Sequence, residues 1–185
     1  MQYNDMGQPP LSSSTTVVVN VIDNDDSNPK FTAKRYYANV FEHSGTQSKE
    51  AIMEEIITEP SEIKAYDGDR GIDTALQYSI LKGEFSSYFS IDSNSGQLFL
   101  VKHLDRESLK EDTMIIHLLA RQVDNIGREA SAEVHITIKD VNDHLPSFEN
   151  DIYAISIVEN LPAGFSVVQV SASDPDIESL IYEWI

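Results

Sequence analysis

The chain has no cysteine, one tryptophan and few basic residues, and two of these scarcities exclude whole classes of structure or partner. Without cysteine, its 185 residues form neither a disulfide framework nor a thiolate metal site. Thirteen lysine and arginine residues stand against thirty-one aspartate and glutamate residues, a net charge of −18 at pH 7. Because basic patches bind nucleic acids and anionic membrane surfaces, this balance argues against both partners. It favours a solubilising surface or the binding of cations.

Long apolar runs are also missing. The sequence contains no signal-peptide hydrophobic region and no apolar stretch of about eighteen residues that would predict a membrane-spanning helix. It contains no Asn-x-Ser/Thr glycosylation site with x other than proline. The spacings described below indicate a fragment of a longer protein, so these absences do not assign a compartment.

Two similar acidic segments stand out in what the sequence does contain. Residues 140–148 read Asp-Val-Asn-Asp-His-Leu-Pro-Ser-Phe, and residues 23–31 read Asp-Asn-Asp-Asp-Ser-Asn-Pro-Lys-Phe. Each follows an alternating apolar run and ends at a proline, which prevents a strand from continuing. Hard oxygen donors gathered in this way suit Ca²⁺, which takes six to eight oxygens. A single such cluster is equally consistent with a solvated polar turn.

The two segments belong to a longer repeat. They lie 117 residues apart, and Pro29 precedes Glu42 by thirteen residues just as Pro146 precedes Glu159. The apolar runs before them align without a gap: Ser14, Val17, Val19 and Val21 on Ser131, Val134, Ile136 and Ile138. An unbroken alignment with a period near 110 residues indicates a tandem array of one module.

The module is predicted to be all-β. Alternating patterns rich in β-branched residues predict strands at residues 14–22, 36–41, 76–80, 114–121 and 132–138. Residues 89–100 predict a hairpin, with Asn-Ser-Gly supplying the positive-φ residues of its turn. Seven or so short strands without a long helix favour an antiparallel Greek-key β-sandwich of immunoglobulin-like type.

One segment interrupts the repeat. Glu42 lies 25 residues before Asp67, whereas Glu159 lies 15 residues before Asp174. The excess contains residues 50–57, whose apolar spacing fits a short helix, although a mobile surface loop is an equal alternative. Because the second copy lacks these residues, we predict that the sandwich can form without them.

Several motifs together resemble the extracellular cadherin repeats. The acidic segments resemble that family's D-x-N-D-N-x-P-x-F linker signature, and the other matching motifs are Leu104-Asp105-Arg106-Glu107, Asp67-Gly68-Asp69, Asp174-Pro175-Asp176 and Val158-Glu159-Asn160-Leu161-Pro162. The resemblance covers essentially the whole chain. It implies a complete repeat at residues 29–140, the tail and linker of a preceding repeat at 1–28, and the linker and first part of the next repeat at 141–185.

The resemblance also implies calcium sites at both linkers. At the downstream linker it assigns as ligands Glu42, Asp105, Glu107, Asp140, Asn142, Asp143, His144, Asp174 and Asp176, with His144 acting through its backbone carbonyl. The seven carboxylates of this set carry −7, and the three Ca²⁺ ions implied by the family carry +6. At the upstream linker the matching positions are Asp23, Asp25, Asp26, Asp67, Asp69 and, through its carbonyl, Asp73.

The upstream set departs from the family pattern at two positions. The segment Ala120-Arg121-Gln122 has a neutral amide where the family has an aspartate, and Gln122 would serve the upstream linker. Asp25 stands where the family has an asparagine, which restores the charge.

The function implied by the resemblance is calcium-dependent cell–cell adhesion, without enzymatic activity, by the extracellular part of a plasma-membrane protein. The implied partners are other cadherin molecules, homophilic or heterophilic, and the neighbouring repeats of the same chain. One alternative is a calcium-stiffened spacer repeat with no adhesive contact. Another is a hydrolase using Asp105 and Glu107 as acid and base, which gives no reason for the 117-residue repetition.

Overall fold

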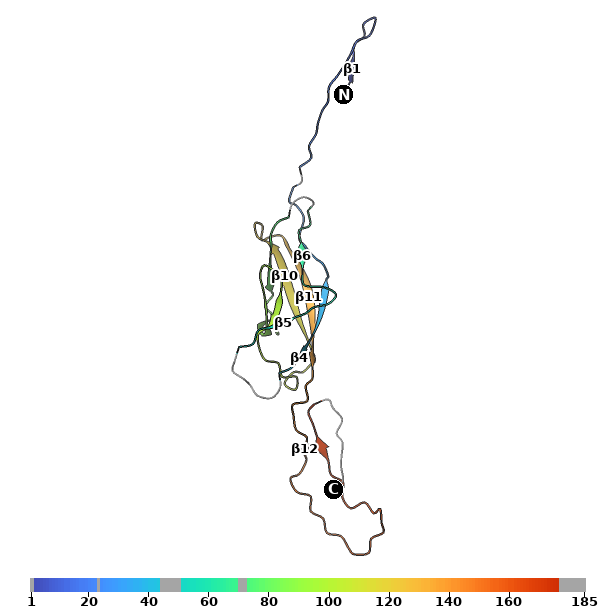
Figure 1. Ribbon diagram of the computed structural model, residues 1–185, viewed down its shortest axis with the longest axis vertical. Helices are drawn as coiled ribbons and strands as arrows, with labels where there is room; N and C mark the ends of the chain where they lie inside the picture. The colour runs from blue at the N-terminus through green and yellow to red at the C-terminus, as the bar shows by residue number, and fades with distance from the viewer. Residues whose placement is uncertain (1, 23, 44–50, 70–72, 177–185) are drawn as a thin grey trace.

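A computed structural model describes residues 2–22, 24–43, 51–69 and 73–176 (Figure 1). Within these residues there is no α-helix, and one 3₁₀ turn, η1, spans Ser86–Tyr88. No helix in the described part of the chain is long and apolar enough to cross a membrane. The strands are β1 Gln2–Asn4, β2 Ser12–Ser14, β3 Lys30–Phe31, β4 Arg35–Phe41, β5 Glu54–Ile56, β6 Ala65–Tyr66, β7 Leu76–Ile80, β8 Phe89–Ile91, β9 Leu98–Leu100, β10 Thr113–Gln122, β11 Glu129–Lys139, β12 Ser147–Phe148 and β13 Ala172–Ser173.

The central part of the chain is a β-sandwich. One sheet has the strand order β4-β11-β10-β7, and the facing layer consists of β5-β9-β8 together with the pair β3-β6. Side chains alternate between buried and exposed along β4 and most of β11, as expected for strands with one face on a core. The inward side chains form one apolar core, whose fully buried members include Tyr36, Leu98, Leu100, Leu104, Met114, Leu118, Val134 and Ile136. The all-β, immunoglobulin-like sandwich predicted from the sequence is therefore confirmed.

Strand β4 differs from the predicted antiparallel pattern, because it runs parallel to β11 while the other pairs are antiparallel. Phe41 pairs with Lys139 at the end of this register. Both strands therefore reach the downstream end of the sandwich side by side. The parallel pairing brings Glu42 next to residues 140–141, which is what a shared binding site at that end requires.

The hairpin predicted at residues 89–100 is present as β8 and β9, which pair from Phe89 with Leu100 to Ile91 with Leu98. Its turn is held by the side chain of Asp92, which accepts hydrogen bonds from the backbone N–H groups of Asn94 and Ser95 at 3.0 and 2.8 Å. Gly96 follows with φ of +79°, a conformation that favours glycine.

We expect Gly96→Ala to destabilise the sandwich by about 1–2 kcal/mol from the left-handed conformation alone. The added Cβ would also lie 2.7 Å from the carbonyl oxygen of Ile63, so the loss should fall at the upper end. Gly83→Ala is the matched control, since a Cβ there meets no atom within 4 Å and φ is not positive. Urea denaturation of both variants checks the prediction, and equal midpoints would contradict it.

The segment at residues 50–57 corrects the sequence interpretation. Residues 54–56 form strand β5 and pair with β9, so the predicted helix is wrong for the residues that the structure describes; residue 50 lies outside them. Ile56 is 6% exposed and belongs to the core, and Ile52 packs against it. β5 is an integral strand of the second layer, which argues against the prediction that the sandwich can form without this segment.

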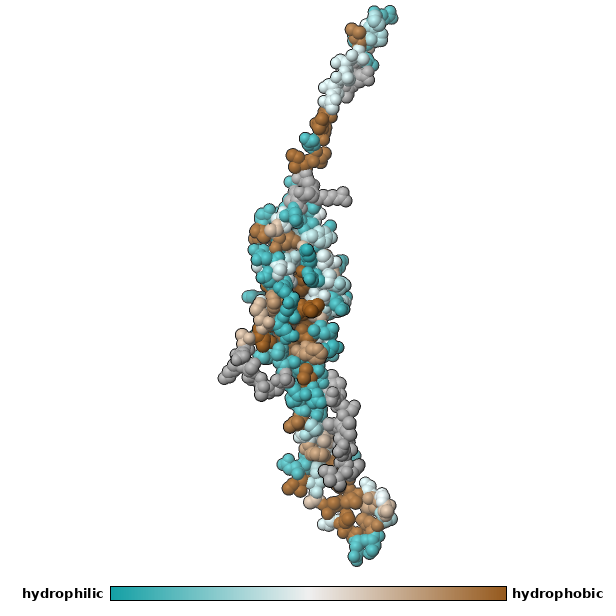
Figure 2. All heavy atoms as spheres, viewed as in Figure 1, coloured by the Kyte–Doolittle hydropathy of each residue, from teal (hydrophilic) through white to brown (hydrophobic). Residues whose placement is uncertain are grey.

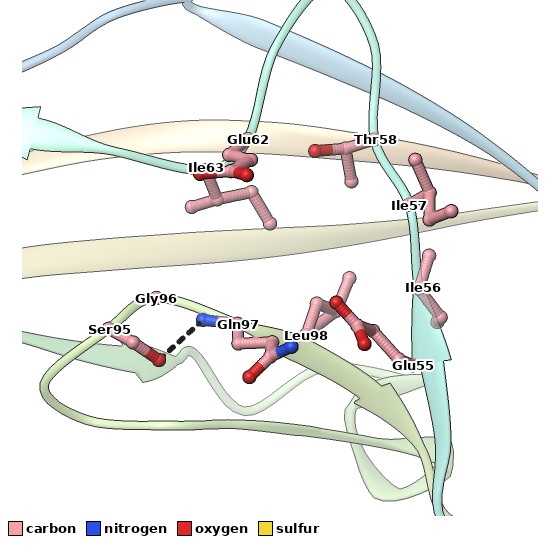
Figure 3. Close-up of a pocket in the computed structure, with 10 residues that line it drawn as sticks. All are labelled: Glu55, Ile56, Ile57, Thr58, Glu62, Ile63, Ser95, Gly96, Gln97 and Leu98. Atoms are coloured by element: carbon pink, nitrogen blue, oxygen red, sulfur yellow. Dashed lines mark hydrogen bonds between the residues drawn. The ribbon is translucent and has the colours of Figure 1, made fainter.

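After β5 the chain leaves the sheet and crosses to the other layer. Glu59 and Tyr37 exchange both backbone hydrogen bonds at 2.8 Å, which ties residues 57–61 to strand β4. Because residues 57–61 leave the second layer, a cavity of about 460 Å³ lies between Ile57–Ile63 and the turn at Ser95–Leu98 (Figure 3). Its floor is apolar, from Ile56, Ile63 and Leu98, and its lining includes two carboxylates, Glu55 and Glu62.

The strand predicted at residues 14–22 forms only at its beginning. β2 ends at Ser14, and the following residues have no regular structure. Val17, Val19 and Val21 are 65–91% exposed, because no described strand pairs with this segment or covers it. Figure 2 shows such apolar residues on the extensions beyond the sandwich.

The start of the central sandwich is repeated after the downstream linker. Lys30 pairs with Tyr66 and Ser147 with Ser173 in corresponding antiparallel bridges. The ring pairs Phe31–Tyr36 and Phe148–Tyr153 both have centroids 6.4 Å apart at nearly perpendicular angles of 72° and 74°. The 117-residue repetition of the sequence is therefore also a repetition of local geometry, although the boundaries after residues 28 and 140 stay a prediction.

Candidate metal-binding clusters at the two linkers

Two groups of acidic side chains meet at the downstream end of the sandwich. One contains Glu42, Asp105 and Glu107, and the other contains Glu107, Asp143, His144 and Asp176. In each group one ligand atom per residue lies within 4.8 Å of all the others. Glu107 belongs to both groups, so its carboxylate connects the base of the central repeat to the linker and to the segment that follows.

Backbone contacts hold the base of this site in place. Glu42 accepts hydrogen bonds from the N–H groups of Arg106 at 2.7 Å and Val141 at 2.8 Å, one on each carboxylate oxygen. Arg106 in turn contacts Asp140 through Nε at 2.6 Å and Glu107 through Nη2 at 3.2 Å. These hydrogen bonds and ion pairs therefore connect the end of β4 to both the Leu-Asp-Arg-Glu segment and the linker. Asp140 raises the pKa of Arg106 further, which keeps this cation charged.

Asp176 joins the linker to the segment that follows it. One of its oxygens, Oδ2, accepts the N–H groups of Asp143 and His144, both at 2.9 Å. These backbone donors, led by that of His144, lower the pKa of Asp176. Asp174 supports the arrangement by accepting the N–H of Asp176 at 3.0 Å. Asp176 is thus held ionised and 5% exposed at the centre of the cluster.

Glu107 has the opposite electrostatic environment. Burial is the largest cause that raises its pKa, and the nearby carboxylates of Glu42 and Asp140 raise it further. Its two carboxylate oxygens are buried and accept no hydrogen bond of good geometry from the described residues, and Arg106 Nη2, 3.2 Å from one of them, balances the negative charge of this region only in part. A buried carboxylate without hydrogen-bond donors is costly unless a cation reaches it. The buried oxygens of Glu107 and the carboxylates grouped around them are the hard oxygen donors that a divalent cation such as Ca²⁺ prefers.

His144 takes part differently from the sequence expectation, which used only its backbone carbonyl. Its Nδ1 lies 2.9 Å from Asp176 and 2.8 Å from Asp143, with Glu107 at 3.9 Å. The hydrogen bond to Asp176 is the main cause that raises the pKa of His144. The imidazole therefore lies among the carboxylates. No spacing in the sequence signals this position for the ring.

The upstream linker carries a smaller group, Asp25, Asp67 and Asp69. Asp69 accepts the N–H groups of Asp26 and Ser27 at 3.1 and 3.0 Å, as Asp176 does for the linker residues 117 positions later. The donor from Ser27 is the largest cause that lowers the pKa of Asp69. The same backbone clamp therefore exists at both linkers.

Not every residue assigned by the resemblance enters a group. Asp140 is engaged by Arg106, and Asp174 holds the backbone of Asp176. Of the assigned acidic positions that the structure describes, four enter none of the three groups, and these are Asp26, Asp73, Asp140 and Asp174. Asp23 lies outside the described residues.

Sequence reasoning did not identify three residues that contact these groups. Arg106 stands in the Leu104-Asp105-Arg106-Glu107 motif, but no sequence pattern indicates its contact with Asp140. Thr74 donates its backbone N–H to Asp67 at 2.9 Å and is the main cause that lowers the pKa of Asp67. Arg128 reaches the upstream linker across 101 residues of sequence, and no local pattern announces such a contact.

The structure thus shows a β-sandwich with groups of acidic side chains at both of its ends. The family model described as the cadherin domain matches residues 49–139. The chain belongs to the cadherin family. This family consists of non-enzymatic adhesion proteins whose repeats generally bind Ca²⁺.

Individual relatives agree with this membership. Cadherin-89D of Drosophila melanogaster is 38% identical over 174 residues, which is 93% of this chain and 8% of that protein. Protocadherin Fat 4 of Mus musculus is 33% identical over 96% of this chain and 3% of its own length. The crystal structure of mouse cadherin-23 EC22-24 is 33% identical with a TM-score of 0.67, covering 96% of this chain and 53% of that one. The chain therefore spans a small part of its curated relatives.

Proposed function

We propose that this chain is part of the extracellular region of a membrane-anchored cadherin, in which Ca²⁺ bound at the linkers stiffens successive repeats into a rod. The observation that carries the proposal is Glu107, which belongs to both downstream groups and has two buried oxygens that accept no hydrogen bond from the described residues, with Arg106 as a nearby cation that also pairs with Asp140. A divalent cation between these groups would join the base of the central repeat, the linker and Asp176. The ligands we assign are those named from the sequence, with the Glu107 and Asp176 carboxylates central among them.

Electrostatics explain why the cation should control stiffness. Two carboxylates about 5 Å apart repel by roughly 3 kcal/mol at an effective dielectric constant of 20. Several such pairs meet here, and among the described residues the contacts across the linker are mainly the hydrogen bonds to Asp176. Without metal, we expect the linker to open and the two parts to move independently.

We predict that Ca²⁺ binds with dissociation constants of about 10⁻⁴–10⁻³ M, the range of extracellular modules. At a hundredfold excess over the dissociation constant, binding adds about 2.7 kcal/mol to the free energy of unfolding. Thermal melts in Ca²⁺ and in chelator should then differ by several degrees. Small-angle scattering should show a longer, stiffer particle in Ca²⁺. Melts and scattering curves that coincide would contradict the proposal.

The adhesive role and its partners are proposed from family membership. The partners would be other cadherin molecules, homophilic or heterophilic, with neighbouring repeats of the same chain as the permanent contacts. One similar structure is described as a protocadherin gammaB7 EC3-6 cis-dimer, and it is 27% identical to this chain with a TM-score of 0.68. A dimer of that relative is in keeping with contacts between cadherin molecules. Aggregation of beads coated with the chain, with and without Ca²⁺, distinguishes adhesion from a spacer role.

A further inference from the structure

At the upstream group the chain places a guanidinium directly on the backbone of the linker. The guanidinium of Arg128 donates to the carbonyl of Asp25 through Nη2 at 2.8 Å and to the carbonyl of Ser27 through Nη1 at 2.9 Å. Its Nε lies 3.6 Å from a carboxylate oxygen of Asp25. The Arg128 side chain is 20% exposed, so solvent screens this charge only in part.

A buried amide marks the inner side of the same group. Gln122 is 1% exposed, and its Nε2 donates to Asp25 at 3.1 Å and lies 3.4 Å from both oxygens of Asp67. Its Oε1 is buried and accepts no hydrogen bond from the described residues. The amide head therefore lies within the carboxylate group and presents an oxygen that a hard cation can use.

The guanidinium offsets part of the negative charge of the upstream group. The upstream carboxylates of Asp25, Asp67 and Asp69 carry −3, which Arg128 reduces to −2. A charge of −2 is neutralised by one divalent cation. The guanidinium also uses lone pairs of two linker carbonyls that a hard cation would otherwise coordinate.

We propose that Arg128 acts as a built-in cation at the upstream linker: it holds the Asp25 segment against the sandwich without metal and lowers the affinity of that group for Ca²⁺. This inference rests on the proposed calcium function and adds to it a role for Arg128 at the upstream linker. The Asp25 segment stays attached to the sandwich when calcium is scarce.

The test is a Ca²⁺ titration of the whole chain followed by amide chemical shifts in NMR. The amides of Gly68 and Thr74 report on the upstream group, and that of Val141, which contacts Glu42, reports on the downstream group. Arg128→Gln should tighten the dissociation constant read at Gly68 by about tenfold, because a charge a few ångströms from the ion is removed. The value at Val141 should stay unchanged.

Two further variants separate charge from other effects. Arg128→Lys keeps the charge and should stay within about twofold of the native value at Gly68. Arg121→Gln removes the same charge from an exposed pair with Glu129 and should leave both reporters unchanged. An unchanged or weaker affinity at Gly68 in Arg128→Gln overturns the inference, as does an equal effect of Arg128→Lys. A native chain whose Val141 amide ignores Ca²⁺ instead overturns the proposed function, so the two failures are distinguishable.

Discussion

Asp143→Ala should weaken Ca²⁺ binding at the downstream linker at least tenfold, a loss of about 1.4 kcal/mol or more. The Asp143 side chain is 10% exposed and lies in one group with Glu107 and Asp176. Its removal leaves Glu107 facing Asp176 with less charge to hold an ion between the central repeat and the next segment. Asp143→Asn keeps the shape and one oxygen, so comparing the two variants separates charge from geometry, and both should exceed the tenfold loss.

Calorimetric titration of two further variants completes this experiment. Asp151→Asn removes the same charge at an exposed position outside the groups and should leave the affinity unchanged. His144→Ala should weaken binding much less than Asp143→Asn, because we assign only its carbonyl to the ion. The ring lies among the carboxylates in the structure, and a bound cation would displace it. A larger loss in His144→Ala than in Asp143→Asn would show that the ring is a ligand and that our assignment is wrong.

The acidic groups could be predicted because their positions depend on spacing that the sequence displays. The acidic linker and the Asp-x-Asp pair recur in the same order in both copies. In each copy the second aspartate of the pair, Asp69 or Asp176, accepts two backbone N–H groups of the linker. The alternating runs likewise predicted β4, β7, β10 and β11, because each has one face on the core. These features are local in sequence, and their geometry follows from strand periodicity.

Features that depend on distant contacts could not be predicted in the same way. Arg128 meets Ser27 only because β11 begins beside the upstream linker, and no neighbouring residue indicates it. The ring of His144 enters the cluster because Asp176 lies next to it in space. The alternating run at Val17–Val21 fits a strand, yet a strand needs a pairing partner, and the described residues supply none.

The segment at residues 51–57 shows how two periodicities compete. Ile52 and Ile56 lie four residues apart, which suits one face of a helix, and the second copy of the repeat reaches its aspartates without these residues. In the structure these residues form a strand instead of a helix. Glu54–Ile56 pair with the backbone groups at the edge of β9, and this pairing buries Ile56 between the layers. Tertiary pairing therefore overrides a local helical pattern.

Ile56→Ala should for this reason destabilise the sandwich by about 2–5 kcal/mol, the range for removing a large side chain from a core. Ile56 is 6% exposed and packs in the main core, so the truncation leaves a cavity beside the space already open under residues 57–62. Ile57→Ala is the matched control: it removes the same atoms one position later, where the side chain is 82% exposed, and should cost less than about 0.5 kcal/mol. Denaturant unfolding of both variants in saturating Ca²⁺ measures the difference. If the two midpoints coincide, β5 contributes little to the fold, and residues 51–57 are the dispensable insertion that the sequence spacing predicts.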